Sequence, residues 1–386
     1  MEIAKGIYNV GVTDKDIDLF EGLYTVPDGV LYNSYVVIDE KIAVFDTADA
    51  RFSDEWLANL KSVLDGRKPD YLIVEHMEPD HSASIAKFVA QYPDTVVVSE
   101  TKAFKMMSQF FGDDIKFEKL EIKEGDELCT GKHNFKFVAA PMVHWPEVMI
   151  AYDTTDKILF SADAFGKFGS SDTTEDWDDE ARRYYIGIVG KYGAQVQTLL
   201  KKAASLEINM ICPLHGPVLR ENLGHYISLY DKWSSYTPEA DGVVIAYTSI
   251  YGNTKKAALM LADRLKEKGY ENVKVFDLAR DDKYEALAQA FRYSKLVLAS
   301  PTYNSELFPP VRAFMDMLAE RGYKNRTVAM IENGSWAPVA ARLMEKRLAE
   351  FKDITLAENK VTVKSALSEE SVSQIEALAA ELCCNS

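Results

Sequence analysis

Four potential metal ligands lie within six residues of this sequence: His76, Glu78, Asp80 and His81 follow the apolar run 71–74 almost directly. A short apolar run that ends in clustered histidines and carboxylates is typical of a buried strand whose following loop binds metal. Four donors this close cannot all face one ion without distortion, but alternating donors on an extended turn can address two. We therefore expect His76 and Glu78 at one ion and Asp80 at a second, with His81 either beside Asp80 or outside the ligand set.

Three further donors each follow a short apolar run. They are His144 after 137–140, Asp163 after 158–160, and His215 after 210–212. Several strand ends could therefore converge on one pocket, and the sequence predicts a dinuclear metal site built from distant parts of the chain.

The histidines are few, and most of them belong to this pattern. Of six histidines in the chain, four have acidic partners in the set described above. His133 lies in a polar turn and His225 in a helix-like stretch, so we interpret both as structural residues.

Composition limits what else the chain can do. A length of 386 residues exceeds what one hydrophobic core usually organises, so two domains are expected. The net charge of −16 argues against nucleic acid as a partner, because phosphate binding needs a basic face. No stretch approaches the roughly 18 apolar residues of a membrane span, and residues 1–5 do not resemble a signal peptide. We expect a cytoplasmic protein without a membrane partner.

The four cysteines show no C-x-x-C pair. The chain therefore carries no sequence signature of a rubredoxin-like iron centre or of a zinc ribbon. Any such electron carrier would have to be a separate protein.

A change in composition and in the pattern of strands and helices near residue 240 predicts a domain boundary. The stretch 234–242 is rich in small and polar residues around Pro238, as linkers are. Before it, strand-like runs interleave with helix-like stretches; after it, strands and helices alternate regularly, which indicates a doubly wound parallel sheet. We predict an α/β protein with domains at 1–240 and 241–386.

The first strand of the second domain runs into a loop of hydroxyl groups and a glycine before a helix. Backbone N–H groups at such a helix start favour an anion, and the absence of G-x-x-x-x-G-K excludes an ATP or GTP loop. The loop is similar to the flavodoxin phosphate loop, and two later loops lie where flavodoxin-like domains enclose the flavin ring, which predicts FMN. Its expected contacts are Thr248, Ser249, Ile250, Tyr251, Gly252, Asn253, Thr254, Pro301, Thr302, Tyr303, Asn304, Asn333, Gly334, Ser335 and Trp336.

The ligand pattern H-x-E-x-D-H, followed in order by His144, Asp163 and His215, resembles the metallo-β-lactamase-like domain of the flavodiiron proteins (A-type flavoproteins), in the two-domain class without a fused rubredoxin. The resemblance implies an αββα sandwich followed by the flavodoxin-like domain. It also implies two non-haem irons: His76, Glu78 and His144 at one, Asp80 and His215 at the other, and Asp163 as the bridge, with His81 either a ligand or a residue behind the ligands. Glu78, where hydrolytic relatives usually have histidine, favours iron over zinc.

The same resemblance implies an oxidoreductase that passes electrons from FMN to the diiron centre and reduces O₂ to water, NO to N₂O, or both. Tyr192 is a candidate hydrogen-bond donor near the irons. The electron donor would be a rubredoxin-like protein or a deazaflavin coenzyme, since the chain lacks a G-x-G-x-x-G fingerprint for NAD(P)H. The family's head-to-tail homodimer, or a dimer of such dimers, would bring one subunit's FMN to the other's irons.

Two other classes of function compete with this interpretation. A dizinc hydrolase of the metallo-β-lactamase type with a fused flavodoxin module would keep the ligands but not the redox link; Glu78 argues against it, and metal analysis distinguishes the two. A non-catalytic electron carrier would need only the second domain, and the complete ligand set in the first argues against that.

Overall fold

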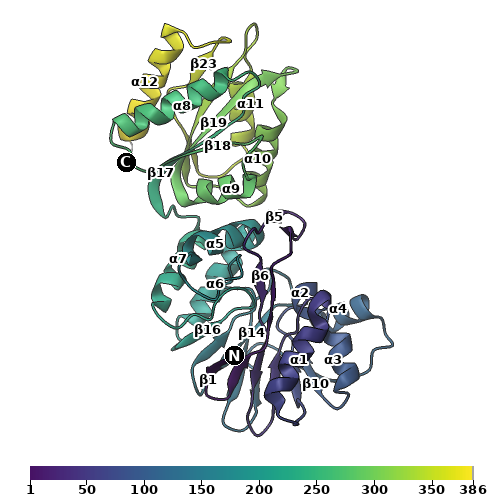
Figure 1. The fold of residues 1–386 in the computed structure, drawn as a ribbon. Coiled ribbons are helices and arrows are strands. Elements are labelled where there is room, and N and C mark those ends of the chain that lie inside the picture. The colour runs from purple at the N-terminus through teal and green to yellow at the C-terminus, as the bar shows by residue number, and fades with distance from the viewer. Residues whose placement is uncertain (385–386) are drawn as a thin grey trace. The chain divides into compact units, whose positions relative to one another are not determined.

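The computed structural model describes residues 1–384 of the chain. Contacts between residues divide it into two compact units: Met1–Tyr185 with Ala194–Asp231, and residues 186–193 with the chain from Lys232 onward. Each unit is described by itself below (Figure 1). The boundary expected between residues 240 and 241 falls somewhat later in the chain than this division, and it stays a prediction.

The first unit is built on two facing sheets, and its core lies between them. Each sheet turns its apolar side chains toward the other, so Phe45 of the first sheet stacks on Phe160 of the second with ring centroids 4.1 Å apart. Burial of each such ring contributes roughly 2–3 kcal/mol. The first sheet has the order β1 (Glu2–Ala4), β2 (Ile7–Asn9), β7 (Tyr35–Val37), β8 (Ala43–Phe45), β9 (Tyr71–Ile73), β10 (Val96–Ser99) and β11 (Glu118–Glu121), and the second β12 (Glu127–Cys129), β13 (Asn134–Ala139), β14 (Met149–Asp153), β15 (Ile158–Phe160) and β16 (Met210–Cys212).

Helices cover the outer faces of both sheets, which completes an αββα sandwich. Figure 1 shows α1, α3 and α4 on the side of the first sheet and α6 and α7 on the side of the second. The helices are α1 (Ser53–Leu64), α2 (Pro79–Ser82), α3 (Ile85–Gln91), α4 (Thr101–Phe111), α5 (Trp177–Tyr184), α6 (Gly193–Ala203) and α7 (Leu223–Ser235), with the short η1 (Ala50–Phe52). Two small hairpins, β3 (Val12–Asp14) with β6 (Val30–Tyr32) and β4 (Leu19–Phe20) with β5 (Tyr24–Thr25), lie outside the two sheets.

Two stretches differ from the sequence-based expectation: one lies in the first unit, and the other includes residues 186–193, which group with the second unit. The motif that we expected as an extended turn contains the short helix α2, because Pro79 suits the first helical position and Glu78 before it is extended. Residues 178–204 have a helix-like sequence, but they do not form one continuous helix: α5 passes into a π-helix, η2 (Tyr185–Val189), and a 3₁₀ helix, η3 (Gly190–Tyr192), before α6. Glycines at 187, 190 and 193 weaken the α-helix there.

The second unit is a doubly wound parallel sheet, as the alternation of strands and helices predicted. The strand order is β18–β17–β19–β21, with β22 and β23 both pairing with β21, so the first strand lies inside the sheet as in flavodoxin. Its strands are β17 (Ala240–Tyr247), β18 (Val273–Asp277), β19 (Tyr293–Tyr303), β20 (Glu306–Leu307), β21 (Arg326–Asn333), β22 (Ile354–Leu356) and β23 (Val361–Val363), and its helices α8 (Asn253–Glu267), α9 (Lys283–Arg292), α10 (Pro309–Glu320), α11 (Ala340–Leu348) and α12 (Glu369–Cys384).

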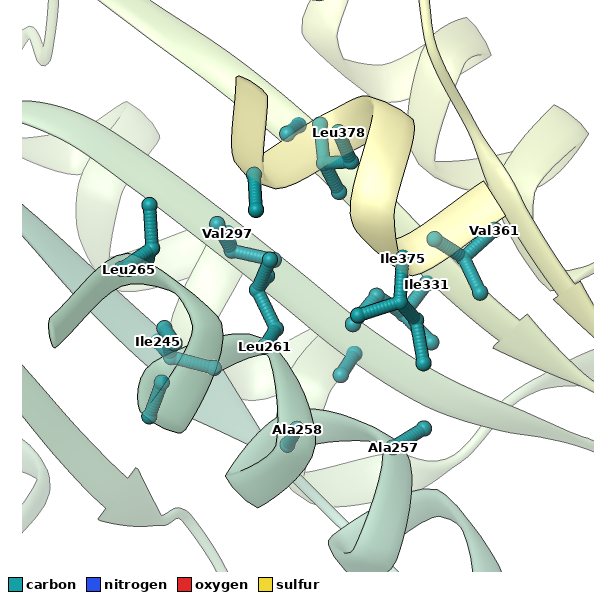
Figure 2. Close-up of a cluster of buried hydrophobic side chains, with 14 of the residues drawn as sticks. Ile245, Ala257, Ala258, Leu261, Leu265, Val297, Ile331, Val361, Ile375 and Leu378 are labelled. Carbon is teal, nitrogen blue, oxygen red and sulfur yellow. The ribbon is translucent and has the colours of Figure 1, made fainter. Parts of the chain in front are cut away.

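One apolar core of the second unit lies between the sheet and the pair α8 and α12. Figure 2 shows Leu261 of α8 beside Val297 of the sheet, and Ile375 of α12 beside Ile331 and Val361, all of them buried. The parallel strands are apolar over most of their length because helices cover them. Among the described residues, no helix combines the length and the apolar character needed to cross a membrane.

Candidate dinuclear metal site and flavin cavity

Three of the predicted ligands meet because their strands run in the same direction. β13 and β15 are both antiparallel to β14, and β15 is parallel to β16, so all three strands end at one edge of the second sheet. His144, Asp163 and His215 follow these ends. The motif that contains His76 follows β9 in the facing sheet.

The first group of donors consists of His76, Glu78, His144 and one oxygen of Asp163. His76 Nε2 lies 3.3 Å from Glu78 Oε2 and 3.2 Å from Asp163 Oδ2. His144 Nε2 lies 3.0 Å from the same Glu78 oxygen and 3.1 Å from the same Asp163 oxygen. Four donor atoms therefore converge on one point.

The second group consists of Asp80, His81, His215 and the other oxygen of Asp163. His81 Nε2 lies 3.0 Å from His215 Nε2, and each of these nitrogens lies 3.3 Å from Asp80 Oδ2. Asp163 Oδ1 is 3.2 Å from His81 Nε2 and 3.6 Å from His215 Nε2. Asp163 thus presents one oxygen to each group, which is the geometry of a bridging carboxylate.

These contacts fit two cations better than they fit a hydrogen-bonded cluster. Two neutral imidazole nitrogens 3.0 Å apart satisfy each other only if one of them donates, and the buried oxygens of Asp80 and Oδ1 of Asp163 accept no hydrogen bond from the described residues. An ion with bonds of about 2.1 Å in octahedral geometry holds neighbouring donor atoms roughly 3 Å apart, as here. Three of the seven donor residues are carboxylates and four are imidazoles, a mixed oxygen and nitrogen set that suits iron.

Residues behind the ligands fix the imidazole orientations. His76 Nδ1 lies 2.9 Å from Glu147 Oε1, and His215 Nδ1 donates to the Leu31 carbonyl at 2.9 Å. Both rings therefore direct Nε2 at the site. Asp46 Oδ1 accepts the backbone N–H groups of Glu75 and His76 and holds the start of the motif.

The electrostatics of the pocket keep its bridging carboxylate anionic. Burial opposes ionisation of Asp163, but the charge of His76 and hydrogen bonds from the ring nitrogens hold the pKa of Asp163 well below its usual range. Burial likewise opposes ionisation of Glu147, yet the hydrogen bond with His76 lowers the Glu147 pKa. Burial instead raises the pKa of Asp46 to about 8. Asp163 and Glu147 thus carry the negative charge beside the place where the ions would lie.

Aromatic rings enclose the second group. The centroids of the Phe20, Tyr32 and Tyr184 rings lie 5.4, 5.8 and 5.4 Å from that of His215. Tyr184 is 1% exposed, so these rings shield the His215 side of the second group from water. Tyr192, the tyrosine chosen from the sequence, ends η3 and is half-buried in the stretch that groups with the second unit, and its role stays a prediction.

The sequence missed Glu147, Asp46 and Tyr184, and it contained only weak signals for them. Glu147 lies three residues after His144, and Asp46 directly follows the apolar strand β8. His133 and His225 have carboxylate partners outside the two groups, Asp153 at 2.8 Å and Asp178 at 2.8 Å.

In the second unit, the three predicted loops surround one cavity of about 330 Å³ at the carboxyl ends of β17, β19 and β21. Thr248, Gly252, Tyr303 and Asn304 were predicted as well but do not line it, and Ser365 lines it without having been predicted. The lining residues are Ser249, Ile250, Tyr251, Asn253, Thr254, Pro301, Thr302, Asn333, Gly334, Ser335, Trp336 and Ser365.

The cavity has the features that FMN requires. Gly252 adopts φ +92° directly before α8, where a side chain would be strained, and it leaves the first N–H groups of this helix without a side-chain cap. Thr248 lies next to the lining residue Ser249, and its buried Oγ1 has no hydrogen-bond partner among the described residues. Tyr251 and Trp336, which are 94% and 93% exposed, offer rings for an isoalloxazine.

Replacing Thr248 by Val tests whether this hydroxyl group, behind the residues that line the cavity, bonds the phosphate of bound FMN. The change keeps the shape and removes the hydroxyl group, and a hydrogen bond to a charged group contributes about 1.5–3 kcal/mol. We expect Thr248→Val to lower the affinity for FMN about 10–100-fold in fluorescence titrations of the apo-flavoprotein. The control Thr327→Val, near the start of β21 and away from the cavity, should change the affinity less than about twofold. Equal affinities for the wild type and Thr248→Val would place the phosphate elsewhere.

An αββα sandwich with a dinuclear site, followed by a flavodoxin-like domain, defines the class of protein. A family model described as "ODP family beta lactamase" matches residues 30–216, and one described as "Flavodoxin" matches residues 245–374.

The comparisons with individual proteins agree with that class. A nitric oxide reductase from Moorella thermoacetica is 31% identical over 372 residues, which cover 94% of this chain and 92% of the relative. The flavodiiron protein of Giardia intestinalis superposes with a TM-score of 0.92 at 26% identity, over 99% of this chain and 96% of that one. Rubredoxin:oxygen oxidoreductase from Desulfovibrio gigas has a TM-score of 0.93 at 24% identity, covers 100% and 98% of the two chains, and supports the fold. The chain belongs to the flavodiiron protein family.

Proposed function

We propose that this chain is a flavodiiron reductase in which electrons from FMN reach a non-haem diiron centre that reduces O₂ to water, NO to N₂O and water, or both. The observation that carries this proposal is the position of the Asp163 carboxylate, because its two oxygens face two separate groups of potential ligands. A bridged pair of redox-active ions and a flavin in one chain suit multi-electron reduction of a diatomic gas.

In this proposal His76, Glu78 and His144 hold one iron, Asp80, His81 and His215 hold the other, and Asp163 bridges them. His81 is included because its Nε2 is as close to Asp163 and His215 as a shared ion requires. When bound, the irons would polarise the gas and deliver electrons, which FMN would replace.

The residues of the chain prepare the site for this chemistry. Glu147 and the Leu31 carbonyl orient His76 and His215, so the imidazole nitrogens need no rearrangement. The rings of Phe20, Tyr32 and Tyr184 keep water from the second iron. A dizinc hydrolase is not favoured, because hydrolysis does not use the flavin cavity.

The domain arrangement and the partners belong to the same proposal. Residues 1–240 would form the diiron domain and 241–386 the FMN domain, as the two family matches support. The exposed rings of Tyr251 and Trp336 at the flavin cavity suit coverage by a partner subunit, in a head-to-tail homodimer or a dimer of dimers. We propose a cytoplasmic enzyme that receives electrons from a separate rubredoxin-like protein or a deazaflavin coenzyme.

Rapid mixing tests the proposed reaction. The protein is reduced anaerobically and mixed in parallel with O₂ and with NO, while flavin absorbance is followed. We expect reoxidation by at least one gas far faster than that of free FMN, and the faster gas identifies the preferred substrate. Reoxidation at the rate of free flavin with both gases would contradict the function.

A further inference from the structure

Glu147 is a buried carboxylate that contacts the metal motif from behind. It lies between β13 and β14, and its side chain is 0% exposed. Oε1 lies 2.9 Å from His76 Nδ1 and accepts the backbone N–H of Met77, also at 2.9 Å. One oxygen atom therefore holds both the ring of His76 and the main chain that leads to Glu78.

This contact determines which nitrogen of His76 can bind a cation. With Nδ1–H donating to Glu147, the lone pair of His76 lies on Nε2, which faces Glu78 and Asp163 at 3.3 and 3.2 Å. An anionic acceptor on Nδ1–H also draws that proton toward itself, so Nε2 becomes a stronger donor. Position and electron donation thus follow from the same hydrogen bond.

We propose that Glu147 is a positioning residue that fixes the tautomer of His76 and lowers the reduction potential of the iron that His76 holds. The proposal rests on the proposed function, since it assumes iron at that place. A negative charge behind a ligand stabilises the ferric state relative to the ferrous state, because it offsets the higher cationic charge. Glu147 would therefore keep the first iron strongly reducing.

The chain contains a matched pair for comparison. His133 Nδ1 lies 2.8 Å from Asp153 Oδ2, and both side chains are nearly fully buried, at 3% and 0% exposure. Asp153 ends β14, the strand that follows Glu147. This pair has the same chemistry and burial but lies outside both ligand groups, so removing its charge controls for the cost of altering any buried histidine–carboxylate pair.

The decisive variant is Glu147→Gln in the full-length protein. A glutamine oxygen can still accept from His76 and Met77, so the shape is kept and the charge is lost. We expect the dissociation constant of Fe²⁺, measured by titrating the metal-free protein anaerobically, to rise about 10–100-fold. In a redox titration followed by EPR, we expect the reduction equilibrium of one iron to shift about tenfold toward the ferrous form, or 59 mV. The reduction potential of FMN in Glu147→Gln should equal that of the wild type. The control Asp153→Asn should have the wild-type Fe²⁺ affinity and iron reduction potential.

A second variant covers the case in which Glu147→Gln fails to fold. Glu147→Asp keeps the charge with a shorter side chain, so its iron potential should stay closer to that of the wild type than to that of Glu147→Gln. The inference is wrong if Glu147→Gln retains wild-type affinity and potential, if Glu147→Asp shifts the potential as a neutral side chain would, or if Asp153→Asn shifts it equally. Failure of the proposed function looks different, because the wild-type protein itself would then bind no iron pair.

Discussion

Asp163→Asn is expected to release both irons and to lower gas reduction about 1,000-fold or more, while FMN stays bound. The variant has one carbonyl oxygen and an amide nitrogen where two anionic oxygens face the two ligand groups. It therefore cannot bridge two cations, and it removes the buried charge that offsets them. A bound metal supplies several kcal/mol of stabilisation to such reactions, which corresponds to the expected factor.

Metal analysis and flavin absorbance of the purified variant measure this outcome. Asp178→Asn is the matched control, because Asp178 is 48% exposed and pairs with His225 outside the site. It should retain two irons and full turnover. If Asp163→Asn also retained two irons and wild-type turnover, the ligand assignment would be wrong.

Arg326→Met is expected to destabilise the FMN domain by about 3 kcal/mol without releasing iron. Arg326 is 3% exposed and donates to the carbonyls of Tyr293 at 2.8 Å, Tyr236 at 2.6 Å and Phe291. Methionine fills a similar volume but removes these hydrogen bonds, at about 1–3 kcal/mol for each buried acceptor left unsatisfied. The Tyr236 carbonyl keeps a long contact with Asn325 Nδ2, at 3.5 Å. The midpoint of the transition that releases FMN should fall by roughly 6–12 °C.

Differential scanning calorimetry with simultaneous FMN fluorescence and iron analysis separates the two domains. The control Arg342→Met changes an exposed arginine of α11, and we expect an effect below about 0.5 kcal/mol. Release of iron together with FMN in one lowered transition would contradict the independence of the proposed domains.

The sequence could predict which donor residues lie close together, because their positions depend on short-range patterns. An apolar run shows where a strand ends, and strands that run in the same direction end at one edge, so the sequence alone could place His144, Asp163 and His215 together. The flavin loops are predictable for the same reason, since they follow β17, β19 and β21. These features need only the identity of each strand and its direction.

Contacts between distant side chains were not predictable. Glu147 acts through a ring 71 residues away in the chain, and nothing near it in sequence indicates that partner. The tyrosines of 178–204 show a second cause. Tyr184 lies in α5 beside His215, but the π and 3₁₀ turns that follow it change the direction of every later side chain, so Tyr192 ends a different segment.

Anomalous diffraction at the iron absorption edge, from crystals of the protein as purified, tests the diiron assignment. We expect two iron peaks, one on each side of the Asp163 carboxylate. The first should lie within bonding distance of Nε2 of His76 and His144, and the second of Nε2 of His81 and His215. A single peak, or two peaks that appear at the zinc edge and not at the iron edge, would contradict the diiron assignment and favour the hydrolase.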